Sequence, residues 1–163
     1  AGATATYFED GFGERTIPIG ELFVGPGVSM LGASDILLQI EVPGSTGIIG
    51  GSFERLTPRS AMDIAIVSSA CQLTLGGPGM RIQDVAVVLG AVAPTPIRAQ
   101  RAEEILRGHE PTAELMEKAS AAAMDDCNPI SDIRGGASYR KSMVEVLVRR
   151  MLGRALKRAE EQM

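Results

Sequence analysis

Few side chains in this 163-residue chain have the type and spacing that enzyme chemistry requires. The one histidine, His109, lies between two predicted helices, and no serine sits in the strand–turn–helix pattern of a nucleophile elbow. Adjacent Asp125 and Asp126 could suggest a metal or proton-transfer pair, but further oxygen ligands do not cluster near them. We therefore expect no catalytic residue and no metal site in this chain.

The two cysteines, Cys71 and Cys127, are far apart in the sequence and form no C-x-x-C motif. With a single histidine they cannot complete a zinc site, so we expect two reduced thiols, as in cytosolic proteins, with a disulfide as the alternative. The N-terminal residues do not resemble a signal peptide, and no apolar run approaches the ~20 residues that span a bilayer. The sequence predicts a cytoplasmic protein without a membrane span.

The glycine clusters at residues 25–32 and 47–51 invite comparison with phosphate-binding loops. Neither matches G-x-G-x-x-G, and neither is followed by the Lys-Ser or Lys-Thr pair of a P-loop. We interpret them as turns, because glycine tolerates positive φ. The formal net charge of −4 argues against a nucleic-acid partner, which usually requires a basic surplus.

A basic stretch near the end of the last predicted helix admits two interpretations. Cations at a helix C-terminus interact favourably with the helix dipole, so the stretch could be an ordinary solvated face. It could instead dock an acidic partner subunit. Its members are Arg149, Arg150, Arg154, Lys157 and Arg158.

The elements that would position these residues change in character along the chain. Residues 4–8, 16–19 and 36–42 have strand patterns, and the glycine-rich residues 44–51 are typical of a connector. Strands that pair only with each other make a poor core, so we expect residues 1–43 to lean on absent sequence or on a partner.

The pattern becomes regular from residue 51. Residues 52–56, 63–75 and 81–92 are predicted strands, with a hairpin connection at residues 76–79, and they would form a three-stranded antiparallel meander.

Three helices are predicted to follow the meander. The first runs over residues 95–107, with Thr95 as its cap and Pro96 in its first turn, and the second starts near Pro111. The third starts near Ser138 and has an apolar stripe at helical spacing, made of Met143, Leu147, Met151 and Ala155. Strands followed by helices indicate an α+β fold, here a three-stranded antiparallel sheet packed on a three-helix bundle.

Several pieces of sequence, in this order and spacing, resemble a known family. They are RTIPI (15–19), LFVGPG (22–27), DILLQIEVP (35–43), FER (53–55), PRSAMDIA (58–65), LGAVAPTP (89–96) and IRGGASYR (133–140). This set is similar to the C-terminal half of the FAD-binding medium subunits of the molybdenum hydroxylases, the family of carbon monoxide dehydrogenase, xanthine dehydrogenase and aldehyde oxidoreductase.

The resemblance implies a domain organisation and a function. Residues 1–45 would close an FAD-binding domain, and residues 50–163 would form the C-terminal domain of the subunit. The complete subunit would hold FAD and pass electrons from the [2Fe–2S] clusters of an iron–sulfur subunit to an external acceptor. A further subunit would hold the molybdenum cofactor. Without the glycine-rich motifs of the other half, this chain alone would bind FAD weakly or not at all and would be inactive.

The resemblance also implies three cofactor-binding residues. Ile36 and Leu37 fall where family members contact the flavin ring, and Glu54 falls where some members carry a lysine or another polar residue. A glutamate there would reverse the local charge and disfavour a reduced anionic flavin. The alternative function is a non-catalytic α+β subunit-interaction module.

Overall fold

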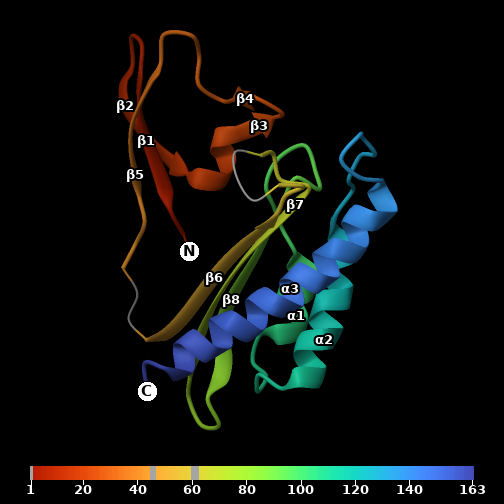
Figure 1. Cartoon of the computed structure of the whole chain (residues 1–163). Helices are drawn as coiled ribbons and strands as arrows, with labels where there is room; N and C mark the ends of the chain where they lie inside the picture. Colours follow the sequence, from red (N-terminus) through yellow and green to blue (C-terminus); the bar gives the residue numbers. More distant parts are fainter. Residues whose placement is uncertain (1, 45–46, 60–62) are drawn as a thin grey trace. The chain divides into compact units, whose positions relative to one another are not determined.

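The computed structural model describes residues 2–44, 47–59 and 63–163. The chain divides into two units, Ala1–Ser45 and Thr46–Met163, each with its own sheet (Figure 1). Residues 60–62 of the PRSAMDIA piece, and residues 45 and 46 of the predicted connector, lie outside the described residues.

The first unit is strand-rich and has a small core. Its sheet has the antiparallel order β2-β1-β5, and its buried apolar side chains are those of Ala5, Tyr7 and Leu22. The elements are β1 (Thr4–Glu9), β2 (Gly13–Pro18), a 3₁₀ turn (Ile19–Leu22), the short pair β3 (Phe23–Gly25) and β4 (Val28–Ser29), and β5 (Ile36–Glu41). The three strands predicted here are therefore present.

The second unit contains one antiparallel sheet in the order β6-β7-β8-β9. Its strands are β6 (Ile48–Leu56), β7 (Val67–Gly76), β8 (Arg81–Gly90) and β9 (Ile97–Arg98). Side chains on β7 alternate between buried and half-buried along the whole strand. This period of two gives the sheet one apolar face, which the helices cover.

Three helices follow in sequence: α1 (Gln100–Leu106), α2 (Ala113–Ala122) and the long α3 (Ala137–Glu160). Figure 1 shows α3 lying along the sheet, with α1 and α2 beside it. The predicted apolar stripe of α3 is confirmed, because Leu147, Met151 and Ala155 are fully or almost fully buried in the core and Met143 is partly buried against it. The α+β fold class is also confirmed. No helix in the described ranges is both long enough and apolar enough to cross a membrane.

The backbones of α3 and β6 approach each other closely at Gly50. A Cβ added to Gly50 would lie 1.7 Å from the Ala155 carbonyl oxygen. Beside this contact, the Ser52 hydroxyl donates a hydrogen bond to the Met151 carbonyl at 2.7 Å. The interpretation of Gly50 and its neighbour Gly51 as turn residues was wrong, since both lie inside β6 and Gly50 is needed for close packing.

Two boundaries at the sheet also differ from the prediction. The sheet has four strands in the described residues rather than three, because Ile97 and Arg98 pair with Leu89 and Val88 of β8. The Ala99 amide then donates to the Val87 carbonyl at 2.8 Å, which delays the first helix to Gln100 and leaves Thr95 outside it.

The long strand β7 starts four residues later than predicted. The Ile66 amide donates to the Leu56 carbonyl at 2.8 Å and closes the connection from β6, so pairing begins at Val67. Asp63 instead accepts hydrogen bonds from Arg59 Nε at 3.1 Å and from the Ile64 amide at 2.8 Å. These bonds stabilise a loop in place of a strand.

Candidate functional site

Ile36 and Leu37 open β5, which is an edge strand of the first sheet. They lie opposite Phe8 and Tyr7 of β1, and their side chains are 61% and 40% exposed. The register shifts just after them, so that Leu38 is an extra residue on β5. A bulge of this kind bends a strand and changes the direction of its side chains. The start of β5 therefore presents apolar side chains beside an edge that is unpaired in the described part of the chain.

Glu54 belongs to the second unit, on the face of β6 that packs against α3. Its carboxylate lies 3.4 Å from Arg150 Nη1 and 2.7 Å from Arg154 Nη1. The contact with Arg154 is an ion pair of short distance but poor hydrogen-bond alignment, since Oε2 has no aligned donor among the described groups. Two guanidinium groups outweigh one carboxylate, so the local charge at Glu54 is positive and not the isolated negative charge that the sequence suggested.

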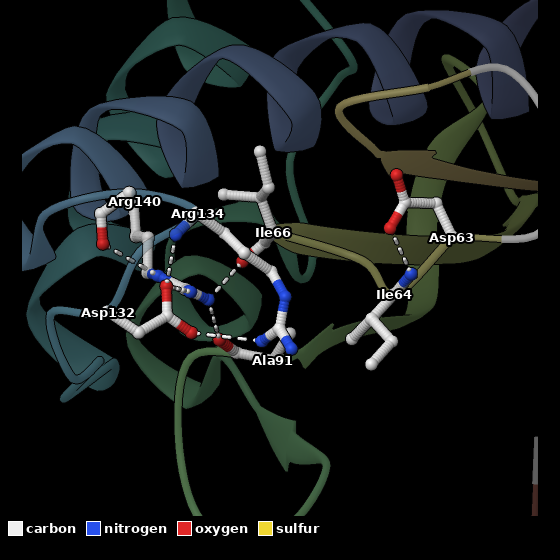
Figure 2. A network of polar contacts seen from close by, with 8 residues as sticks. Asp63, Ile64, Ile66, Ala91, Asp132, Arg134 and Arg140 are labelled. Atoms are coloured by element: carbon white, nitrogen blue, oxygen red, sulfur yellow. Dashed lines mark hydrogen bonds and ion pairs between the residues drawn. The ribbon is translucent and has the colours of Figure 1, made fainter.

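A third cluster joins two of the sequence pieces, LGAVAPTP and IRGGASYR (Figure 2). The buried Arg140 guanidinium donates to the carbonyls of Ile66 at 2.6 Å and Ala91 at 3.1 Å, and to Asp132 at 2.7 Å. Ala91 has the unusual φ of +63°, and its carbonyl thereby reaches Arg140. The start of β7, the end of β8 and the loop before α3 are thus tied to one side chain.

Asp132 is the acidic centre of this cluster. Its carboxylate accepts the Arg134 amide at 2.9 Å, the Arg134 guanidinium at 3.0 Å and Arg140. These hydrogen bonds, led by the Arg134 amide, hold the pKa of Asp132 below its ordinary value. The arrangement is a closed hydrogen-bonded clamp, so it fixes loops and leaves little capacity for a ligand.

The remaining candidate residues lie in surroundings that are typical of structural roles and not of catalysis or metal binding. Cys71 and Cys127 are free and buried, and burial raises the pKa of the Cys71 thiol to about 12, so it is a poor nucleophile. His109 Nδ1 lies 3.1 Å from the Arg107 carbonyl on the surface. Asp125 and Asp126 form ion pairs with Arg101. Within the ranges that the structure covers, no group of three or more acidic, histidine or cysteine side chains could hold a metal.

The three predicted site residues are divided between the two units, so no single unit contains all of them. Ile36 and Leu37 are neighbours in the first unit, and Glu54 is paired within the second. Sequence reasoning missed the pairing of Glu54 with Arg150 and Arg154, which are about 100 residues away, because no local signal marks so distant a contact.

The chain is similar to several characterised proteins. Residues 53–155 match the family described as the CO dehydrogenase flavoprotein C-terminal domain. The carbon monoxide dehydrogenase medium chain of Hydrogenophaga pseudoflava is 30% identical over 143 residues, which are 88% of this chain and 49% of that protein. The nicotine 6-hydroxylase medium subunit of Paenarthrobacter nicotinovorans is 34% identical over 142 residues, 86% of this chain and 48% of that protein.

Solved structures have the same fold. The carbon monoxide dehydrogenase of Hydrogenophaga pseudoflava lacking the Mo-pyranopterin moiety superposes with a TM-score of 0.88 at 31% identity, over 96% of this chain and 53% of the matched chain. Quinoline 2-oxidoreductase from Pseudomonas putida 86 gives 0.84 at 26% identity, over 98% and 53% respectively. The chain therefore spans about half the length of the relatives it matches.

Proposed function

The chain belongs to the family of the CO dehydrogenase flavoprotein C-terminal domain, and from this premise we propose that its parent is the FAD-binding medium subunit of a molybdenum hydroxylase. The observation that carries the proposal is the family match over residues 53–155, together with relatives that are named as medium subunits. The parent would receive electrons from the [2Fe–2S] clusters of one partner subunit, while another holds the molybdenum cofactor. An external acceptor would take the electrons on, in the cytoplasm.

The residues of the first unit fit a flavin as ligand. Exposed apolar side chains at Ile36 and Leu37 suit the face of an aromatic ring. The backbone of the β5 edge, which is unpaired within the described residues, offers hydrogen-bonding groups to the polar rim of that ring. Bound FAD would supply the redox chemistry itself. In this proposal residues 1–45 are the closing part of the FAD-binding domain, and Ile36 and Leu37 at the start of β5 supply one wall of the site.

The role of Glu54 in this proposal differs from that of a bare negative charge. Arg150 and Arg154 occupy its carboxylate, so Glu54 orients two cations. A flavin close to this group would experience a net positive field, which favours a reduced anionic ring. The expected consequence is a raised flavin reduction potential, in contrast to the lowered potential that an unpaired glutamate would cause.

The test is flavin content and flavin reduction in the full-length parent. We expect the parent to purify yellow and its flavin to be bleached by substrate only when the iron–sulfur and molybdenum subunits are present. Ile36→Gln should lower the FAD content, whereas Ile40→Gln, a change at another exposed apolar residue of β5, should leave it unchanged. A full-length parent that carries no flavin and associates with no iron–sulfur protein would overturn the proposal and favour the interaction module.

A further inference from the structure

The solvent face of α3 has a charge distribution unlike that of the whole chain. Residues 149–158 contain five cations and no acid, whereas the chain has a net charge of −4. All five cations are exposed, and they are Arg149, Arg150, Arg154, Lys157 and Arg158. The acids of α3, Glu145 and Glu160, lie outside the stretch, and Glu54 reaches it from β6. One carboxylate against five cations leaves an excess of four positive charges, and we call this surface the α3 basic face.

The fold uses only part of this charge. Arg150 and Arg154 hold Glu54, and Arg158 donates to the Gly51 carbonyl at 2.6 Å. The side chains of Arg149 and Lys157 form neither a hydrogen bond nor an ion pair with any residue in the described ranges. These two cations therefore add positive charge without stabilising the contacts of α3 with the sheet.

A glycine lies at the centre of the same face. Gly153 is exposed in the middle of α3, and a Cβ added there would meet nothing within 4 Å. Its neighbours on the helix surface, three and four residues away, include Arg149, Arg150 and Lys157. Glycine in the middle of a helix destabilises the helix relative to alanine. Packing among the described residues does not require a glycine here. Because Gly153 has no side chain, another molecule can approach the helix backbone closely at this position.

We propose that the α3 basic face docks an acidic surface of another subunit of the complex, with the partner's backbone or side chains approaching α3 at Gly153. The inference rests on the proposed function, which supplies the partner subunits. Opposite charges would steer the encounter and fix its register. Glu54 already orients Arg150 and Arg154, so less side-chain entropy is lost on binding.

The surface fits a protein better than a nucleic acid. Single-strand binding uses aromatic side chains interleaved with cations, and residues 149–158 contain no aromatic residue. The rest of the chain carries the net negative charge, so the surfaces other than the α3 basic face would on balance repel a phosphate backbone.

The first test reverses the charges of Arg149 and Lys157, whose side chains are unpaired among the residues that the structure describes. The parent carrying Arg149→Glu and Lys157→Glu is titrated with the iron–sulfur and molybdenum subunits at low and high salt. We expect association at least about tenfold weaker at low salt, with a shallower dependence on salt, because reversal turns attraction into repulsion. The matched control is Lys118→Glu with Lys141→Glu, which changes the charge equally at exposed lysines outside the face and should assemble like the wild type.

The second test uses the glycine, where a structural role and a docking role predict opposite signs. Gly153→Gln should raise the melting temperature of the isolated parent, because glutamine is the better helix former. The same variant should assemble more weakly, because its side chain fills the space of the partner. A purely structural glycine would not weaken assembly while stabilising the fold.

Several results would overturn the docking proposal. One such result is normal assembly at low salt of both the Arg149→Glu/Lys157→Glu variant and the Gly153→Gln variant. Another is that these substitutions lower the FAD content or the thermal stability of the isolated parent, which would mean that the subunit's own polypeptide covers the face. A loss limited to DNA or anionic-vesicle binding would point to another class of partner. A wild-type parent without flavin would overturn the proposed function instead, and one that binds no partner subunit would overturn both.

Discussion

The close approach of α3 to β6 at Gly50 gives the sharpest prediction, which is the effect of Gly50→Ala. The new Cβ would lie 1.7 Å from the Ala155 carbonyl oxygen, 2.7 Å from the Ala155 carbonyl carbon and 2.8 Å from the Ala159 amide nitrogen. All three atoms belong to the backbone of α3, so no side-chain rotation can make room. The helix must move away from β6, against the hydrogen bond from Ser52 to Met151.

The cost follows from the type of atom that has to move. Inserting a methyl group into a packed core usually destabilises by ~1–3 kcal/mol, and a backbone clash belongs at or above the upper end. We expect the free energy of unfolding to fall by about 3 kcal/mol or more, which lowers the melting temperature by roughly 10 °C for a domain of this size. Urea unfolding followed by circular dichroism measures the change. An unchanged m-value would show that the substitution lowers stability without altering the surface exposed on unfolding.

The neighbouring glycine provides the control. A Cβ at Gly51 would come no closer than 3.8 Å to another atom, the Cys71 carbonyl oxygen, which is an ordinary contact. Gly51→Ala should therefore change the free energy of unfolding by less than about 1 kcal/mol, and in the stabilising direction if the loss of chain entropy in the unfolded state dominates. Equal losses for the two variants would refute the packing argument, since both residues lie in the same strand.

Three further predictions concern the clamp and the core. Arg140→Met should lower the free energy of unfolding by about 3–5 kcal/mol in urea melts, because it leaves buried acceptors without a donor, whereas Arg134→Met should change it by less than about 1 kcal/mol. The Arg134 amide and Arg140 hold the pKa of Asp132 below its ordinary 3.8, so its stabilising effect is complete above that value and is lost as the pH falls through the lowered pKa; Asp132→Asn should flatten this acid limb in melts recorded against pH. The Cys71 thiol, with its pKa raised to about 12 by burial, should react with an alkylating reagent at neutral pH only as fast as the domain opens, while fast labelling without unfolding would contradict its burial.

Regular, periodic parts of the chain could be predicted from sequence because their signal is local. The α3 stripe of Leu147, Met151 and Ala155 repeats at helical spacing, and these residues are buried. The hairpin between β7 and β8 follows from the glycine-rich residues 76–79 between two apolar runs. In both cases the pattern that is read along the chain is the one that packs in space.

Other features could not be predicted because distant residues decide them. Proline at position 96 favours a helix start, but pairing of Ile97 and Arg98 with β8 places a strand there instead. Nothing near Gly50 in the sequence distinguishes a packing glycine from a turn glycine, since the contact comes from a helix about 100 residues later. The Glu54 ion pairs and the Arg140 hydrogen bonds likewise join separate elements, so the charge state of the candidate site became visible only in the fold.

The contact of α3 with β6 also constrains how the second unit is made on the ribosome. The Ser52 to Met151 hydrogen bond spans 99 residues, whereas the β7–β8 hairpin closes over a few. Because local pairs form before distant ones, we expect the hairpin to form early during synthesis, with its apolar face exposed until α3 emerges. During that interval the nascent chain exposes an aggregation-prone apolar sheet face, and a chaperone bound to this face would dissociate when α3 packs on it. A stop codon before residue 137 would make the interval permanent, and such truncated chains should aggregate or be degraded rather than accumulate.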